Sequence, residues 1–278
     1  MAYETSKTPA ASSADAGVSS GRRPHWNKVP EVTVYFWIIK VLCTTAGEAA
    51  ADLLDEKAGL GLTGLSVLMS ALLAVVLAIQ FRTASYHAVV YWPVVVLVGI
   101  VGTLVSDDLT DTMGVPLEAS SILFAIVLVV VFLVWYRRER TVSLHSIDTP
   151  GRESFYWAVV LLTFAFGTAA GELVSERMNF RHWLSAVLFG LVIAAVALAH
   201  FALDLDAVGS FWTVYILTRP LGASIGDCLS RPAGDGGAGL GTVVTGALFL
   251  GVILGVVVYL AVTRRDVAQP QPTVRHAA

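Results

Sequence analysis

The chain has 278 residues, of which 56% are hydrophobic and only 14% are charged, and its mean hydropathy is +0.72. A soluble domain carries about 25% charged residues, so this composition excludes a soluble globular protein and predicts an integral membrane protein. The net charge of −3 argues against a nucleic-acid partner, and two cysteines without a CxxC motif or a Cys/His cluster argue against a disulfide framework or a zinc site.

The chain contains eight segments long and apolar enough to cross a bilayer, which takes about 20 residues of helix. In chain order they cover residues 32–54, 60–81, 87–107, 118–136, 154–175, 182–201, 208–227 and 241–263. The polar segments 1–27 and 264–278 are predicted to be disordered cytoplasmic tails, and residues 28–263 to form one all-α membrane domain.

A fourfold internal repeat organises this domain. Each repeat has a tryptophan, a glycine ten residues later and a carboxylate fifteen residues later. The tryptophans are Trp37, Trp92, Trp157 and Trp212, the glycines are Gly47, Gly102, Gly167 and Gly222, and the carboxylates are Asp52, Asp107, Glu172 and Asp227. We therefore predict four tandem helical hairpins in the same orientation, at about 28–82, 83–138, 149–202 and 203–263. The tryptophans fit either anchoring at the membrane interface or packing between helices.

Charged residues within the membrane belong to the first helix of each repeat. The second helices are uncharged over 60–81, 119–136, 183–199 and 240–263. An all-round apolar helix suits a lipid-facing position. This predicts that the odd-numbered helices form an inner ring and the even-numbered helices pack outside it. Twelve Lys and Arg residues flank the side of the termini and four the opposite side, which predicts that both termini are cytoplasmic.

A polar stripe runs along the odd helices, because positions 3, 7, 11 and 15 after each tryptophan share one helix face. We predict a transport path lined by Lys40, Thr44, Glu48, Asp52, Thr103, Asp107, Thr168, Glu172, Arg219 and Asp227. Its carboxylates Glu48, Asp52, Asp107, Glu172 and Asp227 are candidate metal ligands, and hard oxygen ligands favour Mg²⁺, Mn²⁺ or Ca²⁺. The alternative is that the carboxylates at position 15 are solvated end residues or structural partners of Arg177, Arg181 and Arg231.

Two cations interrupt the repeat pattern at membrane depth. Lys40 lies in the first helix, and Arg219 lies near the middle of the seventh. The Pro220 that follows Arg219 predicts a bent or discontinuous helix, which is typical of transport sites. We expect Arg219 to pair with Glu48 or another inner carboxylate when no cation is bound. The alternative is a permanent structural ion pair.

Several segments resemble a bacterial family of uncharacterised membrane-anchored proteins built from four tandem repeats of unknown function. The resemblance rests on Lys28–Thr33, Tyr35–Lys40, Thr45–Glu48, Val101–Thr103, Ser106–Asp111, Phe155–Trp157, Gly167–Glu172 and Leu217–Ser224. It covers about residues 28–263 and implies the same eight-span architecture in a bacterial inner membrane. It implies no activity.

The leading functional hypothesis is a transporter or channel-like protein for an inorganic cation, preferably divalent Mn²⁺ or Mg²⁺, which would be the substrate and not a resident cofactor. The expected partners are the lipid bilayer and this ion, and the sequence allows a homo-oligomer. A proton-coupled transporter of a small organic anion, held by Lys40 and Arg219, is one alternative. A non-transporting membrane scaffold is another. The chain lacks a nucleophile–base pair, a zinc motif and a phosphate loop, so we do not expect an enzyme.

Overall fold

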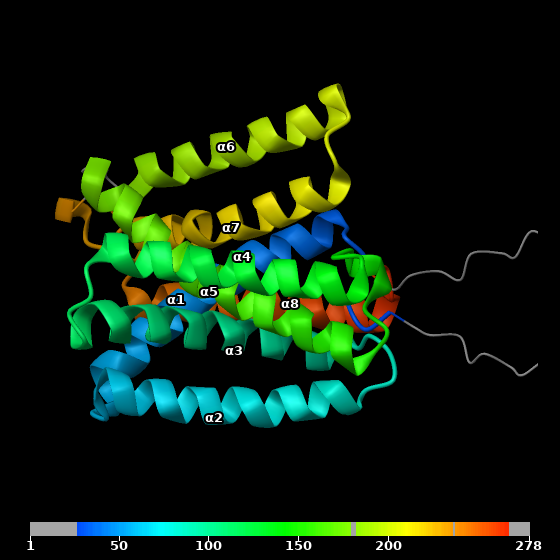
Figure 1. Ribbon diagram of the computed structural model, residues 1–278. Helices are drawn as coiled ribbons and strands as arrows, with labels where there is room; N and C mark the ends of the chain where they lie inside the picture. Colours follow the sequence, from blue (N-terminus) through cyan, green and yellow to red (C-terminus); the bar gives the residue numbers. More distant parts are fainter. Residues whose placement is uncertain (1–26, 179–181, 236, 267–278) are drawn as a thin grey trace, which may run out of the picture.

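The computed structural model describes residues 27–178, 182–235 and 237–266, and within these ranges the chain is helical without strands (Figure 1). The eight long helices are α1 (Val34–Ala58), α2 (Gly61–Arg82), α3 (Ala88–Asp107), α4 (Leu117–Glu139), α5 (Pro150–Met178), α6 (His182–Leu203), α7 (Ala207–Ser230) and α8 (Thr242–Thr263). Short helical turns lie at Asp108–Thr112, Leu144–Ser146 and Ala233–Asp235. The predicted all-helical fold is confirmed.

Local sequence signals set the ends of several helices. The side chain of Thr33 caps α1 by accepting a hydrogen bond from the backbone N–H of Phe36 at 3.4 Å, and α1 ends at Gly59, whose φ of 63° is left-handed. The carboxylate of Asp206 caps α7 by accepting from the N–H of Gly209 at 2.7 Å. Successive helices run antiparallel, so residues 27 and 266 lie at the same end of the bundle (Figure 1).

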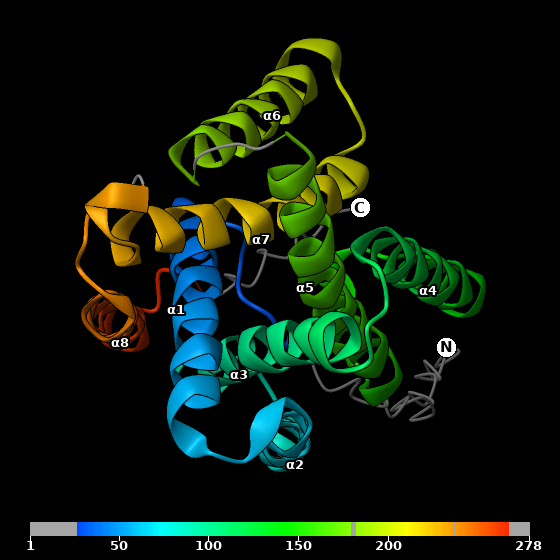
Figure 2. The same ribbon diagram turned by 90° about the vertical axis from the view of Figure 1, so that its left-hand side faces the viewer.

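Viewed along the bundle, α1, α3, α5 and α7 lie at the centre and the even-numbered helices lie outside them (Figure 2). The four central helices contact one another in the order α1, α3, α5, α7 and back to α1. The outer helices expose large apolar side chains, among them Val67, Ile122, Leu191 and Leu254. A bilayer solvates such surfaces, whereas water does not.

The outer helices do not pack mainly within their own repeats. α2 packs chiefly against α3, α4 against α5 and α6 against α7, whereas α8 packs against α1 (Figure 2). The two helices of one repeat are joined in sequence but share few contacts. The second helix of each of the first three repeats therefore packs against the first helix of the next repeat, and α8 of the last repeat packs against α1 of the first. These contacts join all four repeats into one domain.

Seven of the eight long helices in the described part of the chain are long and apolar enough to cross a membrane. The exception is α7, which was predicted to span at 208–227. It has 24 residues, but Arg219, Ser224 and Asp227 lower its hydropathy. Because α7 packs between α1 and α5, Arg219 and Ser224 are buried by protein, whereas Asp227 near the end of the helix is partly exposed.

The two predicted tails lie mostly outside the described residues, but the structure includes the ends that adjoin the helices. Asp266 is 2% exposed and accepts a hydrogen bond from the phenol of Tyr86 at 2.5 Å, and its backbone oxygen accepts from the N–H of Glu31 at 2.9 Å. Burial and the bond to Asp266 raise the pKa of the Tyr86 phenol, which keeps its proton for this bond. Asp266 therefore packs against the segment before α1 and against Tyr86, whereas the predicted tail from residue 267 onward lies outside the described residues.

A buried ion pair joins three segments at the same end of the bundle. The Nζ of Lys28 donates to Glu153 Oε2 at 2.7 Å and to the backbone oxygen of Phe81 at 3.1 Å. The other carboxylate oxygen of Glu153 accepts from the side-chain amide of Gln80 at 3.2 Å. Both charged side chains are less than a tenth exposed. The pair connects the segment before α1 to α2 and α5.

We expect Glu153→Ala to destabilise the protein by about 3–5 kcal/mol, because it leaves the Lys28 ammonium buried without its counter-ion. The matched control is Glu139→Ala, which removes a half-buried partner of Arg152 and should cost less than about 1 kcal/mol. Thermal unfolding of both variants in the same detergent measures the difference. Equal losses would show that the Lys28–Glu153 pair is no more important than a surface pair.

Candidate functional site between the central helices

The predicted polar stripe faces the space between the central helices. Five of its side chains are at most 3% exposed: Lys40, Thr44, Thr103, Thr168 and Arg219. Exposure rises toward the end of the bundle opposite residues 27 and 266, since the Glu48 side chain is 18% exposed and Asp52 is exposed. The stripe is therefore sealed at its inner part and accessible at this opposite end.

An ion pair between α7 and α1 lies at the centre of the stripe. One terminal nitrogen of the Arg219 guanidinium donates to both Glu48 and Thr103, and the other donates to the backbone oxygen of Thr44 at 3.5 Å. The hydroxyl of Thr103 also lies 3.3 Å from Glu48 Oε2. The predicted pairing of Arg219 with Glu48 is present, and it brings together α1, α3 and α7.

The other two threonines of the stripe use their hydroxyls on backbone oxygens. Thr44 donates to Val41 at 2.5 Å and lies 3.3 Å from the oxygen of Thr218, and Thr168 donates to Phe164 at 3.1 Å. Of these three threonines, Thr103 is thus the one whose hydroxyl contacts the central ion pair.

Lys40 lies deeper than the ion pair and is surrounded by aromatic rings. Its Nζ is 3.7 Å from the centre of the Phe164 ring and 4.2 Å from that of Tyr215, which are cation–π distances. The side chain is 1% exposed, and no described residue accepts a hydrogen bond from Nζ. The aromatic rings therefore enclose the Lys40 side chain in the interior of the bundle.

Four carboxylates, one from each central helix, form what we call the acidic mouth: Asp52, Asp107, Glu172 and Asp227. Asp107 interacts electrostatically with Glu48, Glu172 and Asp52. Asp227 accepts a hydrogen bond at 3.2 Å from Nε of Arg231, the residue that follows α7, which is one of the ion pairs named in the alternative interpretation.

The five predicted metal ligands do not converge on one point. Among the described residues, no three His, Cys, Asp or Glu side chains are arranged to hold a metal ion. The physical reason is that the mouth carboxylates stand on four different helices, whereas Glu48 lies one turn deeper and is bound to Arg219. The arrangement is a charged entrance with one inner carboxylate, and not a closed chelating site.

The repeat glycines explain how the central helices come so close. A Cβ built on Gly47 would lie 3.2 Å from the backbone of Gly99, and one on Gly102 would lie 2.6 Å from the Cβ of Phe164. A Cβ on Gly167 would lie 2.7 Å from the side chain of Arg219, and one on Gly222 would overlap Thr44. Each repeat glycine therefore packs against the residue that lies seven positions after a repeat tryptophan on the neighbouring central helix. The first three glycines meet the following repeat, and Gly222 meets the first repeat.

The repeat tryptophans close the inner end of the stripe. Trp92, Trp157 and Trp212 are at most 5% exposed, and Trp37 is half-buried, so packing between helices and not interfacial anchoring describes three of the four. Together with three tyrosines and a phenylalanine they form what we call the aromatic layer: Phe36, Tyr91, Trp92, Tyr156, Trp157, Trp212 and Tyr215. Tyr91 and Tyr156 are hydrogen-bonded within it.

The predicted bent or discontinuous helix at Pro220 is not discontinuous, because α7 is one uninterrupted helix from Ala207 to Ser230. A Cβ on Gly171 would lie 2.8 Å from the Cβ of Pro220, so α5 packs directly against the proline ring. The hydroxyl of Ser224 donates to the backbone oxygen of Pro220 at 2.8 Å. Close packing and this local bond hold the segment helical.

Two residues of the site were not predicted as site residues, namely Phe164 and Tyr215. Both contact Lys40, and the Phe164 ring also lies 5.9 Å from the guanidinium carbon of Arg219. Their position in the repeat was the available signal. Phe164 and Arg219 each lie seven residues after a repeat tryptophan, and Tyr215 and Lys40 each lie three residues after one. An apolar residue at a polar repeat position gives no sign of contact with a cation.

The fold and this interior define a multi-pass helical membrane protein built from an internal repeat. A family model described as Repeat of Unknown Function (DUF347) matches residues 35–86, 90–141, 155–204 and 210–266, so the chain belongs to this family. The four matched segments correspond to the four predicted repeats. No curated protein and no solved structure matched the chain.

Proposed function

We propose that the protein is a membrane transporter or channel-like protein for a small inorganic cation. The observation that carries this proposal is the ion pair of Arg219 with Glu48 at the inner end of an acidic mouth. Here the guanidinium of Arg219, which belongs to the protein, is bound to Glu48, the deepest carboxylate of the path. A mobile cation would bind at the same position. Intramembrane ionisable groups of this kind mark ion paths more often than they stabilise a fold.

The charges of the acidic mouth support a route for cations. Carboxylates on four helices raise the local concentration of cations at an entrance, as acidic rings do in cation channels. A cation that reaches Glu48 displaces Arg219, and the hydroxyl of Thr103 beside Glu48 supplies a neutral oxygen. Oxygen ligands without cysteine or histidine favour Mg²⁺ or Mn²⁺ as the substrate.

Beyond Glu48 the path is closed by the buried Lys40 and the aromatic layer, whereas Glu48 is partly exposed and Asp52 is exposed at the acidic mouth. Transport then requires a second conformation in which the aromatic layer separates. The excess of Lys and Arg on the side of residues 27 and 266 supports cytoplasmic termini and an acidic mouth on the outer side of a bacterial inner membrane.

A second candidate is a transporter of a small organic anion, and it is favoured by Lys40. The Nζ of Lys40 is buried, and no described residue accepts a hydrogen bond from it. A carboxylate or similar anion would supply the missing acceptor and offset the cost of this burial. In this case Arg219 binds the anion together with Lys40. Arg219→Lys separates the two candidates. If the guanidinium binds an anion through two hydrogen bonds, the variant should lose affinity for the anion, whereas a residue that serves only as the counter-ion of Glu48 should tolerate the change.

The test of the cation proposal is thermal unfolding of the purified protein with Mg²⁺, Mn²⁺, Ca²⁺, Na⁺ and organic anions. At a concentration about 100 times the Kd, a bound cation adds about 2.7 kcal/mol to the stability of the wild-type protein. Glu48→Gln removes the inner carboxylate, so the shift should disappear. Asp55→Asn, at an exposed carboxylate near the end of the same helix, is the control and should keep it. A shift that survives in Glu48→Gln would contradict the site.

A further inference from the structure

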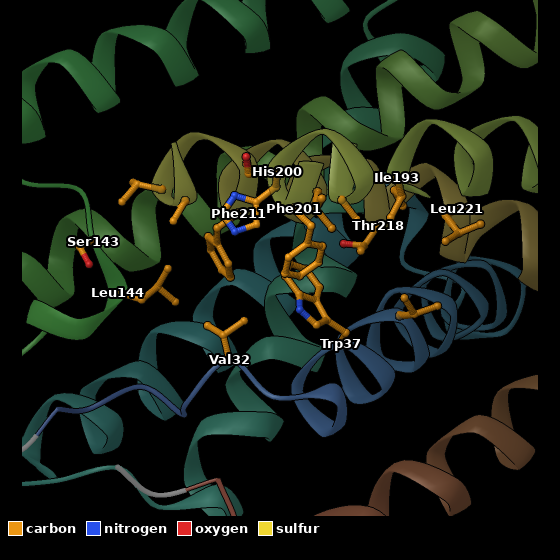
Figure 3. A pocket seen from close by; sticks show the side chains of 16 residues that line it. Val32, Trp37, Ser143, Leu144, Ile193, His200, Phe201, Phe211, Thr218 and Leu221 are labelled. Atoms are coloured by element: carbon orange, nitrogen blue, oxygen red, sulfur yellow. The ribbon is translucent and has the colours of Figure 1, made fainter. Parts of the chain in front are cut away.

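A groove of about 640 Å³ lies on the outside of the central helices, between α6, α7 and the start of α1 (Figure 3). Its walls include Ile193 of α6, Val214 and Leu221 of α7, and Trp37 of α1. None of the carboxylates of the proposed path lines it. The groove is therefore a separate feature from the interior described above.

The groove is mainly apolar, and three of its polar lining residues lie toward one end, among apolar neighbours such as Leu144 and Val208. Ser143 and His200 lie toward the end near residues 27 and 266, where α4 connects to α5 and α6 connects to α7 (Figure 3). Ser210, in the first turn of α7, lies at the same end. From there the walls are formed by apolar side chains such as Phe201, Phe211 and Val214, and they continue to Leu221 near the middle of α7. This is the polarity profile of a lipid, with a headgroup at the membrane surface and a chain in the hydrocarbon.

The groove exists because α6 stands away from the rest of the bundle. α6 packs chiefly against α7, and only 6% of its membrane-spanning part is buried. Figure 1 shows α6 at the edge of the molecule, beyond α7. Water does not fill a space of this polarity, and in a membrane the medium next to such a gap is the acyl chain of a lipid.

We propose that this groove binds one acyl chain of a membrane lipid, with the headgroup beside Ser143, His200 and Ser210. The volume lies in the range of specific ligand sites, and apolar walls with a few polar groups at one end are typical of them. Two wall residues, Thr218 and Leu221, flank the Arg219–Pro220 pair on α7, so the bound chain supports α7 on the side away from Glu48. The proposal holds whatever the protein transports.

Photo-cross-linking tests this site in the full chain reconstituted in nanodiscs. The probe is a phosphatidylethanolamine with a diazirine on its acyl chain, and labelled peptides are identified by mass spectrometry. We expect labelling concentrated on the facing parts of α6, α7 and α1, and Ala197→Trp should reduce it about tenfold, because the indole fills the groove. The matched control is Ala195→Trp, two positions away on the exposed face of α6, which should leave the labelling unchanged.

Gel-filtration profiles check that each variant is folded, and Val214→Phe on the opposite wall replaces Ala197→Trp if that variant aggregates. Labelling spread evenly over α2, α4 and α8, or labelling that Ala197→Trp leaves intact, would overturn the proposal. Cross-links between the α6 helices of two chains, with no lipid label in the groove, would assign the surface to a second copy and would overturn it as well.

Discussion

Arg219→Gln should destabilise the protein by about 3–5 kcal/mol, because it leaves Glu48 without its counter-ion among the central helices. The double variant Glu48→Gln/Arg219→Gln should recover most of this loss, since two neutral amides need no counter-ion. A double-mutant cycle from unfolding in detergent measures the coupling. If the destabilisations of the two single variants simply add in the double variant, the Arg219–Glu48 ion pair does not stabilise the fold, and the prediction is wrong.

The same variant separates an exchangeable pair from a permanent one. If Arg219 competes with a mobile cation, Arg219→Gln frees Glu48, and a cation should then stabilise the variant more than it stabilises the wild-type protein. If the pair is only structural, cations should stabilise neither. A charge swap, Glu48→Arg with Arg219→Glu, that kept transport would contradict the exchange.

Gly102→Ala should destabilise the protein by about 1–3 kcal/mol, although alanine forms helices better than glycine. The new Cβ would lie 2.6 Å from the Cβ of Phe164 and 3.2 Å from the backbone nitrogen of Ala165, so α3 and α5 would have to move apart. Thermal unfolding measures the loss. Because Phe164 contacts Lys40, the separation also disturbs the site.

The control for this prediction is Gly251→Ala on α8, where a Cβ would meet no described atom within 4 Å. There the same exchange should stabilise by up to about 1 kcal/mol, since only helix propensity changes. The two variants are therefore expected to have opposite signs. Stabilisation of the protein by Gly102→Ala would show that the central helices tolerate a wider spacing.

Much of the architecture was predictable because the repeat places the same residue types at the same helix positions four times. Trp, Gly and carboxylate at fixed spacing indicated the four repeats, and apolar second helices indicated the lipid-facing side. The pairing of Arg219 with Glu48 was predictable because two opposite charges at membrane depth have few other partners.

Other features depend on three-dimensional packing that a repeat pattern does not contain. The sequence did not indicate that α2, α4 and α6 pack on the next repeat and α8 on the first, since the apolar second helices carry no charged residue that would specify a neighbour. Pro220 suggested a broken helix, but its fit against Gly171 keeps α7 continuous. The five carboxylates suggested a metal site, but four of them stand on different helices around the mouth and Glu48 lies one turn deeper, paired with Arg219.

Ion flux into proteoliposomes tests the central claim most directly. The wild-type protein should carry Mn²⁺ or Mg²⁺ across the membrane, and Glu48→Gln should abolish the flux while it keeps the folded state. The Asp55→Asn variant should transport like the wild type. Flux of an organic anion that depends on Lys40, with no cation flux, would contradict the account and assign the interior to anions.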